Sequence, residues 1–182
     1  LTFDVGALDD DVARALEDRV RATLADLPAQ APDVAPGPRA VREVPVCRCP
    51  GCAPDLEAVA RATGLAPDAV ARLHGEPIYT VEFLGFAPGF PYLAGLPAAL
   101  HLPRRDVPRP RVPAGSVAIA GAQAGIYPRA TPGGWHVVGR TDLVLFDPRR
   151  TPPAWFAPGD RVRFVARPHG SLRWDAPRAE AR

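Results

Sequence analysis

The sequence predicts an α+β fold, with a small N-terminal α/β domain over residues 1–75 and an all-β domain, a barrel or sandwich, over residues 76–167. Apolar residues at helical spacing occur in the first of these regions. Short apolar runs, separated by clusters of glycine and proline, dominate the second region. Residues 168–182 form a polar tail.

The end of an opening strand, one long helix and a second strand are expected before residue 47. Apolar residues repeat at helical spacing from Val12 to Leu27, after three consecutive aspartates that suit a helix N-terminus. Residues 41–46 alternate like a strand, and Pro45, which cannot donate a hydrogen bond to a sheet, indicates an edge position. Because the chain opens at Leu1 on what resembles the end of a strand, we expect this domain to be incomplete at its start.

Two short helices complete the first domain. Residues 55–63 follow a proline, which suits a helix start, and are closed by Gly64. Residues 67–73 form a second helix, closed by Gly75. The second domain is expected to contain strands at residues 78–84, 116–120, 135–140, 143–146 and 161–166.

Charge and hydropathy argue against several kinds of partner. The net charge of +2 is too small to indicate nucleic-acid or membrane binding. No apolar run approaches the roughly 20 residues of a transmembrane helix, and no signal peptide is visible, so the cytoplasm is the expected location. The sequence contains no lysine, so it supplies neither a Schiff-base lysine nor a P-loop lysine.

Residues 83–148 carry the most specific motifs. FLGFAPGFPYLAGLP covers residues 83–97, PRRDVPRPRVPAGSVAIAGAQAGIYP covers 103–128, TPGGWHVVGRT covers 131–141 and LFDP follows at 145–148. In this order and spacing the motifs resemble the family of 5-oxoprolinase B subunits, also named allophanate hydrolase subunit 1, KipI, or carboxyltransferase subdomains C and D. The resemblance covers about residues 40–166.

The resemblance implies a fold and a set of partners. The second domain is then a cyclophilin-like β-barrel. Members of the family act with a KipA-like C subunit (allophanate hydrolase subunit 2) and a third subunit, and the complex cleaves 5-oxoproline to glutamate at the expense of ATP. ATP is therefore expected for the complex, with no ATP site assigned to this chain.

Other functions remain open. The family also includes an inhibitor of a sensor histidine kinase, and related paired halves form the carboxyltransferase part of urea carboxylase or accompany allophanate hydrolase. A proline isomerase is suggested by the cyclophilin-like fold alone and ranks last, because a fold does not determine a function.

Six residues are candidates for substrate binding. Arginine pairs with a carboxylate through two hydrogen bonds, and Gln123 and Tyr127 can hydrogen-bond beside a glycine-rich turn. His136 can transfer a proton, and Gln123 and Arg140 also match the family pattern. No catalytic residue is assigned, because neither serine of the chain lies in a nucleophile motif. The candidates are Gln123, Tyr127, Arg140, Arg109, Arg111 and His136.

Cys47, Cys49 and Cys52 form a C-x-C-x2-C motif. Thiolates at this spacing can share a zinc ion, but a fourth ligand is missing nearby in the sequence. Free thiols are therefore favoured and no metal is expected. Redox-sensitive pairing of two of the cysteines remains open.

Overall fold

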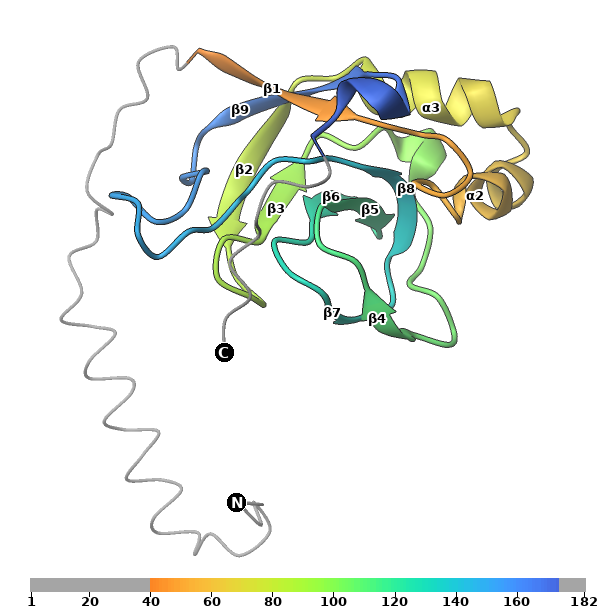
Figure 1. Ribbon diagram of the computed structural model, residues 1–182. Helices are drawn as coiled ribbons and strands as arrows, with labels where there is room; N and C mark the ends of the chain where they lie inside the picture. The colour runs from red at the N-terminus through yellow and green to blue at the C-terminus, as the bar shows by residue number, and fades with distance from the viewer. Residues whose placement is uncertain (1–39, 174–182) are drawn as a thin grey trace, which may run out of the picture. The chain divides into compact units, whose positions relative to one another are not determined.

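The computed structural model describes residues 40–173, which belong to one compact unit that begins at Pro38. This part of the chain has the mixed α+β composition expected from the sequence (Figure 1). The helix expected between Val12 and Leu27, and the opening strand, lie outside the described residues.

The described elements follow one another in a simple order. Two helices, α2 (Leu56–Thr63) and α3 (Pro67–Gly75), lie between the first and second strands. The strands are β1 (Val41–Val46), β2 (Tyr79–Leu84), β3 (Pro91–Ala94), β4 (Arg109–Val112), β5 (Ser116–Ala120), β6 (Gln123–Ile126), β7 (Thr131–Gly133), β8 (His136–Arg140) and β9 (Arg161–Ala166). Two 3₁₀ turns, η2 (Ala98–Leu100) and η3 (His169–Ser171), complete the set.

The main sheet closes almost completely on itself. Its seven strands run in the order β1-β9-β2-β3-β6-β5-β8, while β4 and β7 form a separate ribbon. At the two edges, the backbone of Cys47, just after β1, exchanges hydrogen bonds of 2.8 and 2.9 Å with that of Arg140 in β8. This bridge joins the first and last strands of the sheet, so the structure is a nearly closed β-barrel.

β5 separates two apolar cores, because its side chains alternate between them. Val117 and Ile119 belong to the main core, which α2 and α3 also help to fill. Ala118 and Ala120 belong to a smaller core that is rich in aromatic side chains. All five residues of β5 are consequently buried, which explains why its sequence shows no alternation of polarity.

Both short helices are confirmed, with ends set by local backbone chemistry. α2 is closed by Gly64, whose φ of 71° lies in the left-handed region that glycine adopts at little cost. α3 begins on Pro67 and continues to Gly75, two residues beyond its expected end. Neither helix is long and apolar enough to cross a membrane.

The strand predictions hold where the strands are long and apolar. The sequence missed β3, β4, β6 and β7, each of which has only three or four residues and contains proline or glycine. The strand expected at residues 143–146 is wrong, because Phe146 forms only an isolated bridge with Ala154. These short strands are specified by their neighbours in the barrel rather than by their own composition.

The domain boundary expected near residue 75 is not where the structure divides. β1 pairs in parallel with β9 along its whole length, from Val41 opposite Arg161 to Val46 opposite Ala166. Residues 41–75 are therefore part of the same unit as the barrel. As expected from Pro45, β1 is an edge strand of the sheet.

Candidate functional site

A cavity of about 690 Å³ opens beside the β5–β6 hairpin. The hairpin turn at Gly121 is tied to the segment after η2 by a hydrogen bond of 2.7 Å from the Gly121 N–H to the carbonyl of Leu102. The volume lies in the range typical of small-molecule sites. The lining residues are Glu82, Ala94, Gly95, Leu96, His101, Pro103, Arg104, Ala120, Gly121, Ala122, Gln123 and Trp135.

Four polar side chains of different character border this cavity. Gln123 donates a hydrogen bond of 2.9 Å from its amide nitrogen to the Glu82 carboxylate. The Nε2 atom of His101 lies 2.9 Å from the carbonyl oxygen of Leu96, which leaves Nδ1 as an acceptor when Nε2 carries the proton. Arg104 adds a guanidinium group. The cavity thus offers one cation, one carboxylate, one amide and one imidazole to a ligand.

A second, smaller cavity of about 70 Å³ adjoins the first, and Arg104 and Trp135 line both. Its walls include Tyr127 and Phe90, whose ring centroids are 5.2 Å apart in an edge-to-face arrangement. Burial raises the pKa of the Tyr127 hydroxyl above its ordinary value. Tyr127 is therefore a neutral hydrogen-bonding group at neutral pH, rather than a phenolate.

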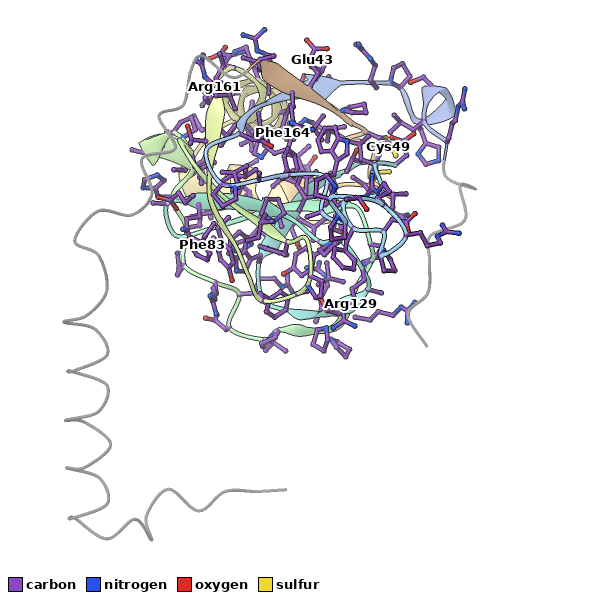
Figure 2. The ribbon with its side chains drawn as sticks, turned by 90° about the vertical axis from the view of Figure 1, so that its left-hand side faces the viewer. Glu43, Cys49, Phe83, Arg129, Arg161 and Phe164 are labelled. Carbon is purple, nitrogen blue, oxygen red and sulfur yellow. The ribbon has the colours of Figure 1, made fainter. Side chains whose placement is uncertain are left out.

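Two exposed aromatic rings lie at or next to the small cavity: Phe86 lines it, and Phe83 contacts its lining residue Tyr92. Phe83, labelled in Figure 2, is 46% exposed. Its ring stacks on that of Tyr92 with centroids 4.3 Å apart. Phe86 is 62% exposed and has a φ of 64°, which is uncommon for a residue other than glycine. Exposed aromatic side chains of this size are typical of surfaces that contact another molecule.

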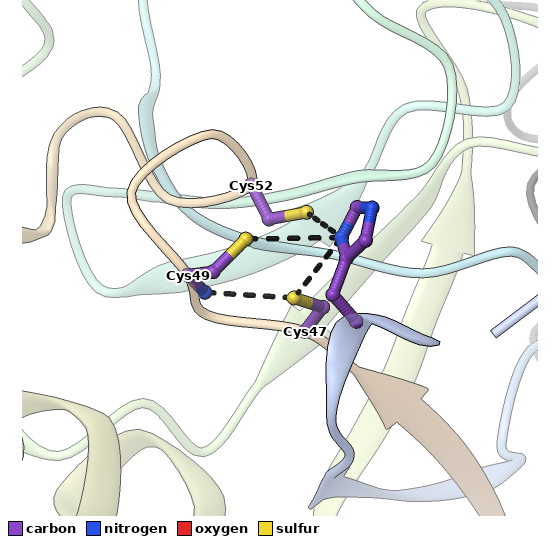
Figure 3. Close-up of side chains that lie close together, drawn as sticks. Cys47, Cys49 and Cys52 are labelled. Carbon is purple, nitrogen blue, oxygen red and sulfur yellow. Dashed lines mark hydrogen bonds between the residues drawn. The ribbon is translucent and has the colours of Figure 1, made fainter. Parts of the chain in front are cut away.

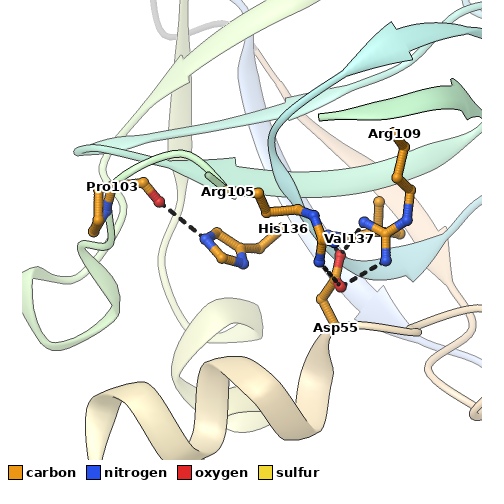
Figure 4. Close-up of polar contacts among 6 residues, drawn as sticks. All are labelled: Asp55, Pro103, Arg105, Arg109, His136 and Val137. Atoms are coloured by element: carbon orange, nitrogen blue, oxygen red, sulfur yellow. Dashed lines mark hydrogen bonds and ion pairs between the residues drawn. The ribbon is translucent and has the colours of Figure 1, made fainter. Parts of the chain in front are cut away.

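Asp55 lies at the centre of a cluster of ion pairs and hydrogen bonds (Figure 4). Its buried carboxylate accepts hydrogen bonds of 2.7 Å from both terminal nitrogens of Arg109 and one of 2.8 Å from Arg105. The backbone N–H of Val137 donates a further bond of 2.7 Å. This arrangement connects the start of α2 to β8 and to the segment that carries Arg104.

The charge of Asp55 is stabilised by these donors. Burial by itself would raise the pKa of the carboxyl group, but hydrogen bonds from Arg109 and Val137, together with the charges of Arg109 and Arg105, lower it below its ordinary value. Asp55 is therefore ionised at neutral pH and holds both arginines in place. The sequence indicated Asp55 only as the start of a helix, so its partners were missed.

The structure separates the six binding candidates into two groups. Gln123 lines the large cavity and Tyr127 lines the small one. The His136 Nε2 atom lies 2.9 Å from the carbonyl oxygen of Pro103, a residue of the large cavity. The remaining three candidates line neither cavity: Arg109 binds Asp55, Arg140 donates to the carbonyl of Ala114 at 3.2 Å, and Arg111 is exposed on β4.

Sequence reasoning missed several residues that border the large cavity. Arg104 and His101 stand in a proline-rich segment without periodicity, and Glu82 is an alternating polar residue of a strand. A signal for Arg104 and Trp135 was present, because both lie within the motifs that carry the family resemblance. Their convergence on one cavity depends on the pairing of β3 with β6 and on the β5–β6 turn.

Comparison with known proteins agrees with this fold. The family described as carboxyltransferase domain, subdomain C and D, matches residues 3–156. The α+β barrel described above therefore represents a carboxyltransferase-type domain, and the chain belongs to the carboxyltransferase domain family, subdomains C and D.

Individual relatives refine this placement. The chain is 54% identical over 128 residues to the 5-oxoprolinase B subunit of Escherichia coli O157:H7, an alignment that covers 70% of this chain and 59% of the relative. It is 49% identical over 127 residues to the 5-oxoprolinase B subunit of Bacillus subtilis strain 168, covering 70% of this chain and 53% of that protein. The chain thus spans somewhat more than half the length of these relatives.

A solved structure supports the same fold. The conserved uncharacterized protein PH0987 from Pyrococcus horikoshii superimposes with a TM-score of 0.70 at 36% sequence identity. That superposition covers 92% of this chain and 71% of the Pyrococcus protein.

Proposed function

We propose that the chain is one component of an ATP-dependent 5-oxoprolinase, which acts with a KipA-like C subunit and a third subunit. The observation that carries this proposal is the sequence identity of 54% and 49% to two proteins named as the B subunit of 5-oxoprolinase. The reaction consumes water and ATP, opens the lactam ring of 5-oxoproline, and yields glutamate, ADP and phosphate.

The large cavity supports this proposal through the groups that border it. 5-Oxoproline has one carboxylate and one ring amide, and a guanidinium such as that of Arg104 binds a carboxylate through two parallel hydrogen bonds. The side chains of Gln123 and His101 provide donors and acceptors for the ring amide. Trp135 supplies an apolar wall against the ring carbons.

The described residues support the proposal that partner subunits take part in the reaction. Neither serine lies in a nucleophile motif, and the described cavity contains no pair of side chains arranged as nucleophile and base. We propose that this chain binds and orients the substrate, while the activated groups come from the partners. The exposed rings of Phe83 and Phe86 are candidates for contact with the KipA-like partner.

The test is reconstitution of the complex. The chain is co-expressed with a KipA-like subunit, the pair is isolated by size exclusion, and glutamate formation from 5-oxoproline is measured after addition of the third subunit and ATP. We expect a stable pair and turnover that disappears when this chain is left out. Arg104→Ala and Gln123→Ala should each lower kcat/KM at least about tenfold, equivalent to roughly 1.4 kcal/mol of transition-state stabilisation.

A matched arginine provides the control. Arg61 is exposed in the last turn of α2 and lines neither cavity, so Arg61→Ala should leave turnover unchanged. If Arg104→Ala and Arg61→Ala behave alike in an active complex, the cavity is not the substrate site. Failure of the two proteins to form a complex would instead contradict the paired-subunit function and would favour the histidine-kinase inhibitor.

A further inference from the structure

Parallel pairing of β1 and β9 brings two distant segments together. Val46 at the end of β1 lies opposite Ala166 at the end of β9. The pairing continues for one more step, because the N–H of Arg167 donates a hydrogen bond of 2.9 Å to the carbonyl of Val46. Since parallel strands end at the same edge, the cysteines that follow β1 meet η3, the turn that follows β9.

Three thiols and one imidazole converge at this edge (Figure 3). The Nδ1 atom of His169 lies 3.6 Å from the sulfur of Cys47, 3.7 Å from that of Cys49 and 3.4 Å from that of Cys52. All four potential ligand atoms lie within 4.8 Å of one another. His169 thus supplies the potential fourth ligand atom that the local sequence lacked.

The spacing matches a tetrahedral metal centre. Bonds of about 2.3 Å from zinc to sulfur and about 2.0 Å from zinc to nitrogen place sulfur and nitrogen about 3.5 Å apart at tetrahedral angles. The three observed sulfur–nitrogen distances fall on both sides of this value. A redox pair of cysteines would require two sulfurs, and gives no reason for the third thiol and the imidazole to be almost equally spaced.

The loop around the thiols is already folded for such a centre. Residues 49–52 form a tight turn, in which the carbonyl of Cys49 accepts hydrogen bonds of 2.8 and 2.9 Å from the N–H groups of Cys52 and Ala53. The N–H of Cys49 points at the Cys47 sulfur, 3.5 Å away. Cys47 and Cys52 are buried, and Leu172 packs against them. A backbone donor and an apolar cover both suit a thiolate–metal site.

We infer that Cys47, Cys49, Cys52 and His169 form a binding site for a zinc ion. Four protein ligands fill a tetrahedral shell and leave no position for substrate or water, so the role of the ion is structural rather than catalytic. The centre joins the end of β1 to the segment after β9. Because the backbone of Cys47 also pairs with that of Arg140 in β8, the ion stabilises the bridge at which the barrel closes.

This site is separate from the substrate cavity. None of its four residues lines either cavity. Zinc binding is thus independent of whether the cavity takes 5-oxoproline. The expectation of no metal rested on the missing fourth ligand, and the fold supplies that ligand from 117 residues beyond Cys52.

Metal content of the untagged chain, purified with a reducing agent, is the first test. We expect one zinc ion per chain when the metal content is measured by inductively coupled plasma mass spectrometry. After removal of zinc with a chelator, anaerobic addition of Co²⁺ should produce thiolate-to-metal charge-transfer bands and the intense d–d bands of a tetrahedral site. His169→Gln should weaken Co²⁺ binding by more than about tenfold, since even changes outside the ligand shell reach that size. Cys49→Ser should alter the charge-transfer bands.

His101→Gln is the matched control, because His101 is an exposed histidine outside the cluster. The His101→Gln chain should bind zinc and Co²⁺ as the parent chain does. His169 is itself exposed, so His169→Gln should fold, which circular dichroism checks. The inference is overturned if the reduced parent chain holds no zinc and gives no tetrahedral Co²⁺ spectrum. It is equally overturned if His169→Gln binds Co²⁺ as the parent does. A disulfide between two of these cysteines that survives treatment with the reducing agent would overturn it as well.

Discussion

At Gly125 the backbone of β6 passes directly against the aromatic core. A Cβ atom at this position would lie 2.8 Å from the end of the Phe90 ring and 3.0 Å from the Trp135 ring. Both rings are buried, so neither can move aside freely. A single hydrogen atom in place of a methyl group thus permits the contact between the strand and the wall of the small cavity.

Gly125→Ala is therefore expected to lower the free energy of unfolding by about 1–3 kcal/mol, the usual cost of overpacking a core. Urea denaturation measures the change. Gly75→Ala serves as the control, because its Cβ would meet only the carbonyl oxygen of Phe164 at an ordinary 3.5 Å. Since alanine favours helix over glycine by about 1 kcal/mol, that control should be neutral or stabilising. Equal effects of the two substitutions would contradict the packing argument.

At the scale of elements, α2 depends on one carboxylate for its attachment. Asp55 stands at the N-terminus of α2 and receives donors from Arg105, Arg109 and Val137. These donors belong to β4, β8 and the segment beside the large cavity. The ion cluster therefore stabilises the fold and also positions Arg104, the neighbour of Arg105.

Removal of the Asp55 carboxylate should strongly destabilise the chain. Asp55→Ala leaves two arginines without their anion, and breaking a buried ion pair in this way typically costs about 3–5 kcal/mol. The midpoint of urea unfolding tests this expectation. Asp68→Ala, at an exposed acidic residue in the first turn of α3, should cost no more than about 1 kcal/mol. Similar losses at both positions would show that Asp55 acts only on the helix dipole.

For the whole molecule, one buried histidine connects stability to pH. His74 is fully buried between α3 and the sheet, with its ring centroid 4.6 Å from that of Phe164. Its Nδ1 atom lies 2.9 Å from a terminal nitrogen of Arg48, which can only donate, so Nδ1 accepts. Burial, and then the charge of Arg48, lowers the pKa of His74 well below its ordinary value.

The sign of the effect follows from proton uptake. Below a pH of about 6.5 the unfolded chain binds a proton at His74, whereas the folded chain does not, so the free energy of unfolding falls as the pH falls. The slope contributed by one such group approaches about 1.4 kcal/mol per pH unit. Unfolding in urea at several pH values between about 5 and 7.5 should show this slope in the parent chain. His74→Gln should reduce the slope, while His101→Gln should retain it; a slope unchanged in His74→Gln would contradict the assignment.

Local sequence patterns were sufficient for the regular elements. The apolar spacing located α2 and α3, the closure at Gly64 gave the end of α2, and Pro45 indicated that β1 is an edge strand. Gly75, expected to close the second helix, is instead the last residue of α3. The long, β-branched strands β2, β8 and β9 were also recognisable. The motifs between residues 83 and 148 indicated the family, because several long motifs in one order rarely arise together by chance.

Contacts between distant residues were decided only by the tertiary structure. His169 joins the three cysteines because β1 and β9 pair in parallel. Asp55 meets Arg109 because the fold places the β4–β7 ribbon beside the start of α2. Arg104 borders the cavity for a similar reason. The sequence determined which segments form helices and long strands, since those depend on residues a few positions apart. The register and closure of the sheet decided which side chains share a site, because they depend on pairings between segments that are remote along the chain.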